Sequence, residues 1–160
     1  MSEIKSTREW FAASGQIPAG MQPNSRQAAF YTGMQLEELA EKLQAIFGPG
    51  DFAAELIGAL QLTGDMFKKG AYDEHVYDAL RARTHAMLDA DCDLIWVSIG
   101  AAAAQGADIE KAYAEVGRAN WDKFPGGVVT RDPATGKVIK PHGWVGPKLL
   151  QFVHPTLRGL

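Results

Sequence analysis

The 160-residue chain is 46% hydrophobic and 22% charged, close to the average for globular proteins. Its net charge of −3 argues against a protein that coats nucleic acid, and no apolar run approaches the roughly 20 residues that cross a bilayer. The single cysteine, Cys92, excludes an internal disulfide and a zinc site built from cysteines. Since the first ten residues also lack the apolar core of a secretory signal, we expect one cytoplasmic domain.

Four helices are expected, with approximate bounds 25–48, 52–69, 74–105 and 109–124. Asn24, Asp51 and Asp108 are the expected N-caps, because their side chains can accept hydrogen bonds from the free N–H groups of a first turn. Before them, residues 1–24 are broken by glycine and proline, apart from a short helical turn at Arg8–Ala13.

The pattern changes after residue 126. Val128–Thr130 and Lys137–Lys140 flank a segment rich in turn formers, 132–136, which predicts a small β-hairpin. We therefore predict an all-α fold in a single domain: a four-to-five-helix bundle with its helical core at about 25–125. A small C-terminal β-hairpin and an irregular basic tail are expected over about 126–160.

Charge is distributed unevenly between these parts. Residues 1–117 carry 17 acidic and 9 basic side chains, a balance of −8, whereas residues 118–160 carry 2 acidic and 7 basic, a balance of +5. An acidic body with a basic tail suits a ligand that brings both a cation and phosphate groups. Docking of the tail on the acidic body explains the same pattern.

Three carboxylates share one turn of the first long helix: Glu37, Glu38 and Glu41. Like charges at this spacing cost roughly 0.2–0.5 kcal/mol per pair, and a divalent cation such as Mg²⁺ relieves them by taking oxygen ligands. At about 100° per residue, the three share an arc with Phe30 and Met34 upstream, which is unlike a solvated face. A solvated face with a Glu38–Lys42 ion pair is the alternative.

A second acidic pair lies on the third predicted helix. Asp89 and Asp93 fall within about 40° of each other, on an arc shared with Ala86 and Trp96, whereas Asp91 lies on the far side. We expect the pair on a packed face, where carboxylates must be paired, metal-bound or neutral. All-carboxylate ligation favours Mg²⁺ or Mn²⁺ over iron or zinc. Structural aspartates satisfied by N–H groups or arginine are the alternative.

Candidate phosphate ligands close the fourth predicted helix and follow it. Asn120 offers an amide and Lys123 a positive charge. Lys137 and Lys140 lie on opposite faces of an extended segment, so we expect different roles for them. Trp121 can stack on a base, although an aromatic residue is also an ordinary core residue.

These elements resemble a known family. Glu37-Glu38-x-x-Glu41 matches the EExxE signature of the MazG-like, all-α nucleoside triphosphate pyrophosphohydrolases, and Asp89…Asp93-Leu94-Ile95-Trp96 resembles their second acidic motif. Ala119–Phe124 and Gly136–Pro141 resemble the Asn…Lys and Gly-Lys-x-x-Lys-Pro elements of phage-type members. The resemblance spans about residues 25–147. It departs from the usual ExxD at position 90, which is Ala, and Asp89 takes the place of the missing Glu.

The resemblance implies a Mg²⁺ site, which Mn²⁺ is expected to fill as well. Its implied ligands are Glu38, Glu41 and Asp93, with Asp89 as a further one. The implied catalytic residues are Glu37 and Glu38: Glu37 as a further ligand or as the base that activates water, and Glu38 as the other candidate base.

The resemblance also implies a substrate and an assembly. Asn120 and Lys123 would contact the nucleotide, and Lys140 its phosphates. The implied reaction is hydrolysis of a (deoxy)nucleoside triphosphate between the α- and β-phosphates. MazZ-type phage relatives act on dGTP, which makes dGTP one option; dCTP, dUTP, phosphoribosyl-ATP and a non-catalytic nucleotide-binding protein are the alternatives. Family members form homodimers or homotetramers, and phage origin would place the protein in the host cytoplasm.

Overall fold

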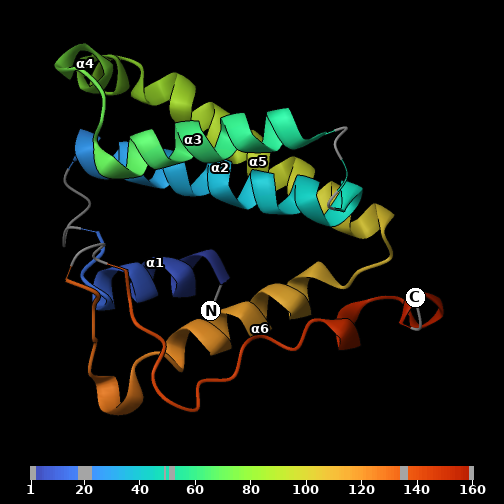
Figure 1. Cartoon of the computed structure of the whole chain (residues 1–160). Coiled ribbons are helices and arrows are strands. Elements are labelled where there is room, and N and C mark those ends of the chain that lie inside the picture. Colours follow the sequence, from blue (N-terminus) through green and yellow to red (C-terminus); the bar gives the residue numbers. More distant parts are fainter. Residues whose placement is uncertain (1–2, 18–22, 49, 51–52, 134–136, 159–160) are drawn as a thin grey trace. The chain divides into compact units, whose positions relative to one another are not determined.

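The computed structural model describes residues 3–17, 23–48, 50, 53–133 and 137–158. Within these ranges the chain forms six α-helices and no strand or sheet beyond one isolated bridge, which confirms the predicted all-α class (Figure 1). None of the described helices combines the length and the apolar character needed to cross a membrane. The chain divides into two compact units, residues 22–90 and residues 1–21 with 91–160. The predicted single domain stays a prediction.

The unit of residues 22–90 is built on a helical hairpin. Helices α2 (Ser25–Phe47) and α3 (Ala54–Lys69) lie side by side and run antiparallel (Figure 1). Asn24 Oδ1 accepts a hydrogen bond from the Gln27 N–H at 3.0 Å, which confirms the predicted cap of α2. α3 ends, as predicted, before Gly70, whose left-handed φ of 66° lets its N–H bond back to the last turn. Asp51 lies outside the described residues.

The core of this hairpin is small. Ala40, Ala53 and Ile57 are buried, and Leu43 and Leu60 pack against them. Ala40 and Leu43 lie on one face of α2, because residues three or four apart share a face of a helix. Ile46 and Phe47 continue that face toward the C-terminal end of α2, where they are exposed.

The third predicted helix, 74–105, is two helices. The structure breaks it at Arg83 into α4 (Glu74–Ala82) and α5 (Thr84–Ala104). Arg83 leaves the helical region with φ −112° and ψ 21°. Next to the break, the Thr84 hydroxyl hydrogen-bonds to the carbonyls three and four residues before it, at 3.0 and 3.2 Å. Hydroxyl bonds of this kind compete with the backbone ladder and bend helices, a local effect that apolar periodicity does not report.

The other unit pairs helices from opposite ends of the sequence. α1 (Glu3–Ala13) extends the short turn predicted there, and it lies beside α6 (Ile109–Trp121) (Figure 1). The Trp10 indole N–H donates to the Asn120 carbonyl at 2.9 Å. Asp108 caps α6 as predicted, accepting the Lys111 N–H at 3.1 Å.

The predicted β-hairpin is reduced to a single bridge in the described residues. Arg131 and Val138 pair antiparallel, and the Asp132 N–H donates to the Lys137 carbonyl and the Ile139 N–H to the Thr130 carbonyl, both at 2.9 Å. Residues 134–136 of the predicted turn, 132–136, lie outside the described residues. Val128 and Ile139 are exposed, and Val129 and Val138 are only half-buried, so the described residues of the segment lack a fully buried face. A two-stranded hairpin without such a face is marginal at best. Three short 3₁₀ turns complete the tail: η2 (Pro125–Gly127), η3 (Leu150–Phe152) and η4 (Pro155–Leu157).

Candidate functional site

The three carboxylates of α2 separate into two groups. Glu37 is half-buried, and its Oε2 atom, itself buried, lies 3.1 Å from the Lys68 ammonium on α3. Glu38 and Glu41 are exposed. Burial alone would lower the pKa of Lys68, but its hydrogen bonds to Asp65 and Glu37 outweigh burial and raise that pKa. Lys68 is therefore a fixed positive charge beside the acidic turn.

The predicted packing of the second acidic pair is wrong for this chain. Asp89 and Asp93 are exposed, and Asp91, placed on the open side by the helical wheel, is half-buried. The reason is that the covered side of α5 is a different one: Met87 and Asp91, one turn apart, are half-buried, and no described side chain of the helix is fully buried.

The donor set fits a hard divalent cation in its chemistry, because all four predicted ligands are carboxylates. It is not assembled, however: among the described residues, no three His, Cys, Asp or Glu side chains come together as a group that could hold a metal ion. The structure thus offers Glu38/Glu41 and Asp89/Asp93 as two exposed pairs, each one helical turn long.

Three of the four predicted substrate-binding residues do come together. The Lys123 ammonium donates to Asn120 Oδ1 at 2.7 Å and lies 5.8 and 5.5 Å from the ring centroids of Trp10 and Trp144. The Lys140 ammonium lies 4.7 Å from the Trp144 centroid. Such cation–π contacts contribute about 0.5–1 kcal/mol each where the site is exposed. We call these five residues the Lys–Trp cluster.

The two tryptophans of the Lys–Trp cluster are held by the end of α6. The Trp144 indole N–H donates to the Ala119 carbonyl at 2.6 Å. The Trp10 indole N–H donates to the Asn120 carbonyl at 2.9 Å. Trp10 also stacks on the buried Phe124, with 5.3 Å between centroids. Hydrogen bonds therefore hold both indoles in place, and the two lysines contact the faces of these rings.

The Lys–Trp cluster is electrostatically unbalanced. Burial lowers the pKa of Lys123, and the nearby charge of Lys140 lowers it further. In the described part of the chain, no carboxylate lies at ion-pair distance from either ammonium. Two like charges held together in this way favour an anion between or beside them.

One predicted binding residue lies apart, and one was missed. Trp121 packs edge-on against Phe124, with 5.7 Å between centroids, and has no place in the Lys–Trp cluster. Trp144 was not predicted. The available signal was a large aromatic residue four positions after Lys140 in a segment rich in proline and glycine, where a core role is uncommon.

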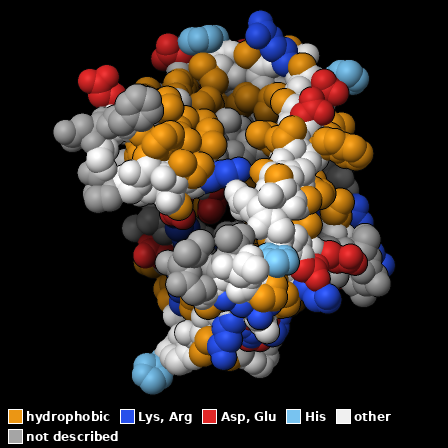
Figure 2. All heavy atoms as spheres, turned by 90° about the vertical axis from the view of Figure 1, so that its right-hand side faces the viewer, with side chains coloured by type: hydrophobic (Ala, Val, Ile, Leu, Met, Phe, Trp, Pro, Cys, Tyr) orange, Lys and Arg blue, Asp and Glu red, His pale blue; other side chains and the backbone are white. Residues whose placement is uncertain are grey.

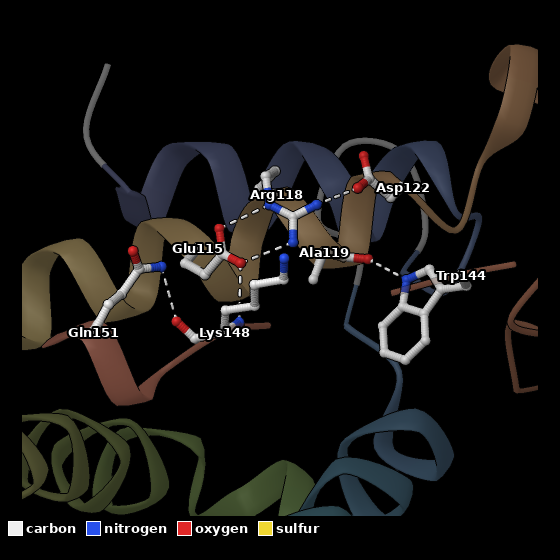
Figure 3. Close-up of polar contacts among 7 residues, drawn as sticks. All are labelled: Glu115, Arg118, Ala119, Asp122, Trp144, Lys148 and Gln151. Atoms are coloured by element: carbon white, nitrogen blue, oxygen red, sulfur yellow. Dashed lines mark hydrogen bonds and ion pairs between the residues drawn. The ribbon is translucent and has the colours of Figure 1, made fainter. Parts of the chain in front are cut away.

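A groove of about 840 Å³ adjoins the cluster. Trp144, Lys148 and Gln151 of the tail line it together with Glu115, Arg118 and Asp122 of α6, and Figure 3 shows these side chains. Arg118 binds Glu115 at 2.7 and 2.8 Å and also contacts Asp122, while the Lys148 N–H donates to Glu115 at 3.0 Å. Trp144 belongs to both the groove and the Lys–Trp cluster.

Glu115 is the most perturbed acid of this groove. The Arg118 guanidinium and the Lys148 backbone N–H lower the pKa of its carboxyl from 4.5 to about 2. Glu115 therefore pairs with Arg118 on α6 and also accepts the Lys148 N–H, so it connects the tail to α6.

Comparison with models of known families, with curated proteins and with solved structures finds no match to this chain.

Proposed function

We propose that the protein hydrolyses a (deoxy)nucleoside triphosphate between its α- and β-phosphates, giving the monophosphate and pyrophosphate. The observation that supports this most is the Lys–Trp cluster. Lys123 and Lys140 come from two motifs about 20 positions apart, and both ammonium groups lie over the Trp144 ring, while Asn120 accepts a hydrogen bond from Lys123. In the MazG-like family that the sequence resembles, these motifs are expected to bind the polyphosphate of a nucleotide.

The charges of the cluster suit this ligand. A charge-assisted hydrogen bond to phosphate contributes about 1.5–3 kcal/mol, and neither lysine has to leave a carboxylate among the described residues to make one. The groove next to Trp144 falls within the roughly 300–1,000 Å³ of small-molecule sites. We place the nucleoside there, with the phosphates toward Lys123 and Lys140.

The acidic residues have the complementary task. In this proposal Glu38, Glu41, Asp89 and Asp93 would hold a Mg²⁺ ion, which would neutralise phosphate charge and make water more acidic. Glu38, which is exposed, takes the proton of the attacking water as general base. Lys123 and Lys140 stabilise the departing pyrophosphate.

The proposal includes a homo-oligomer, and α5 supports it. Successive residues advance about 100°, so Leu94 to Val97 point in four directions around the axis, and all four are at least half exposed, Trp96 at 79%. Residues 94–105 carry no charge. A helix that is apolar all round is normally buried. Hydrophobic side chains also lie at the surface in Figure 2, orange in the upper part of the view.

A second copy of the chain is the occupant we propose for this surface. The occupant must be apolar where it meets α5, because residues 94–105 carry no charge. A two-fold pairing brings the same uncharged stretch of both copies together, which makes the surface complementary to itself.

Pyrophosphate release from a panel of dNTPs, phosphoribosyl-ATP and NTPs with Mg²⁺ tests the proposal. We expect release from at least one, with dGTP as the first candidate and dCTP or dUTP as the next. Preference for phosphoribosyl-ATP would assign the related pyrophosphohydrolase. Binding without turnover of any member would favour the non-catalytic nucleotide-binding protein.

A further inference from the structure

Residues 144–152 of the tail lie along α6 and run in the direction opposite to it. In the described part of the chain, hydrogen bonds join the two at three levels, which pair Trp144 with Ala119, Lys148 with Glu115 and Phe152 with Asp108. Their lengths are 2.6, 3.0 and 2.9 Å, and Figure 3 shows the first two. The tail is therefore fastened to α6 from the N-cap of the helix to its last turn.

The Lys–Trp cluster depends on this docking, because its members come from both elements. Asn120 lies on α6 and Lys123 just after its end, whereas Lys140 and Trp144 belong to the tail. The ammonium groups of the two lysines lie 5.5 and 4.7 Å from the centroid of the same Trp144 ring. A phosphate group can therefore engage both lysines only while the tail lies on α6.

The docked tail brings like charges together. Burial lowers the pKa of Lys123, and the nearby charge of Lys140 lowers it further. This repulsion acts against the docked position of the tail when no anion is bound. A bound phosphate relieves the repulsion, so phosphate binding and docking of the tail favour each other. Without a ligand, other contacts have to keep the tail in place.

Glu115 makes the contact best placed to do so. Its side chain is only 14% exposed, and the Arg118 guanidinium holds its two oxygens at 2.7 and 2.8 Å, a paired geometry that fixes the carboxylate on α6. One of these oxygens also accepts the Lys148 N–H. Of the three levels, this one alone joins a side chain of α6 to the backbone of the tail, and it lies four residues from Trp144.

We propose that Glu115 is a positioning residue for phosphate binding: by holding Lys148 on α6, it keeps Trp144 and Lys140 next to Lys123. The inference rests on the proposed function and adds to it a residue that acts on the phosphates only through the tail. A negatively charged side chain then supports the binding of an anion, which is the opposite of its direct electrostatic effect.

The sign of this effect is the test. Isothermal titration of the full chain with pyrophosphate should show binding weakened about fivefold or more by Glu115→Gln, the usual size of a coupling between distinct sites. Direct electrostatics would instead tighten binding, because the substitution removes a negative charge. Unchanged or tighter binding by a folded Glu115→Gln variant would overturn the inference.

Glu110→Gln is the matched control. Glu110 is exposed in the first turn of α6 and takes part in none of the three contacts with the tail. Its substitution removes the same charge from the same helix, so pyrophosphate should bind as tightly as to the wild type or slightly more tightly. An equal loss for Glu110→Gln and Glu115→Gln would contradict a role that acts through the tail.

A double-mutant cycle separates positioning from a merely structural role. In a Lys140→Met/Trp144→Ala background the tail has lost its side chains of the cluster, so adding Glu115→Gln should change the affinity by less than about twofold. Circular dichroism verifies that each variant is folded. The full loss in this background would contradict the inference, as would a Glu115→Gln variant that is less stable but binds pyrophosphate normally.

The inference and the proposed function fail differently. If the wild type binds pyrophosphate and Glu115→Gln binds it equally well, the positioning role falls and the proposed function stands. If the wild type neither binds pyrophosphate nor releases it from any substrate of the panel, both fall.

Discussion

Gly33 on α2 and Gly64 on α3 meet so closely that a Cβ on Gly33 would lie 2.6 Å from the Gly64 carbonyl oxygen. Both are buried within their helices. Glycine in a helix interior costs roughly 0.5–1 kcal/mol relative to alanine, so its presence at both positions has a local reason. The close approach of the two backbones also brings Lys68 within reach of Glu37.

Gly33→Ala is therefore expected to destabilise the fold by about 1–3 kcal/mol, because the added methyl group overlaps backbone and the stem of Lys68. Gly58→Ala on α3 is the matched control. Nothing lies within 4 Å of its Cβ position, so alanine there should stabilise by about 0.5–1 kcal/mol. Urea unfolding measures both, and equal effects of the two substitutions would refute the close-packing explanation.

Lys123→Met should weaken binding of pyrophosphate about 10- to 100-fold, since it removes a charge-assisted contact worth about 1.5–3 kcal/mol. Stability should not fall, because burial already disfavours the charged form of this lysine and lowers its pKa. Lys140→Met should also weaken binding of pyrophosphate, but by a smaller factor, because Lys140 is exposed.

Lys137→Met serves as the control for this pair. Lys137 is exposed and belongs to the same segment, but the cation–π contacts that define the Lys–Trp cluster are made by Lys123 and Lys140. Isothermal titration with pyrophosphate distinguishes the variants. Equal losses for all three lysines would indicate attraction by overall charge and not a site.

Glu115 predicts a pH dependence of stability. Its pKa is about 2 in the folded chain against 4.5 ordinarily, so the unfolded state binds its proton first as the pH falls. The stability it contributes is complete above about pH 4.5 and is lost progressively toward pH 2. The difference in Tm between the wild type and Glu115→Gln should therefore shrink from pH 6 to pH 2. A difference that stays constant would exclude the Arg118 pairing as its cause.

Trp96→Glu should dissociate the oligomer, because it places a charge in the uncharged 94–105 stretch of α5. His85→Glu, at an exposed position in the first turn of the same helix, adds a similar charge outside that stretch and should leave the oligomer intact. Light scattering after gel filtration gives the masses. A monomeric wild type would contradict the proposed pairing.

Much of the helical pattern was predictable from local chemistry. Asn24 and Asp108 cap their helices as expected because a cap depends only on the next three residues. The break at Arg83 was missed because the apolar period continues through it. The hairpin at 128–140 is reduced to one bridge, because β-propensity reflects packing on a half-buried surface and no described side chain of this segment is fully buried.

Local chemistry also made part of the site predictable. Asn120 and Lys123 are one turn apart on a helix, so their meeting follows from spacing. The positions of Trp10 and Trp144 depend on hydrogen bonds to residues more than 20 positions away. The ion pair between Lys68 and Glu37 depends on the close approach of two glycines of different helices. No local pattern reports such contacts. Asp89 and Asp93 were assigned to a packed face because the wheel shows which residues share a face but not whether that face is covered.

The phosphorus NMR spectrum of the reaction products tests the central claim most directly. With Mg²⁺ and the preferred triphosphate, we expect equal amounts of nucleoside monophosphate and pyrophosphate, and Glu41→Gln should form neither while remaining folded. Formation of a diphosphate and orthophosphate, no turnover of any triphosphate, or near-normal turnover by Glu41→Gln would contradict the account.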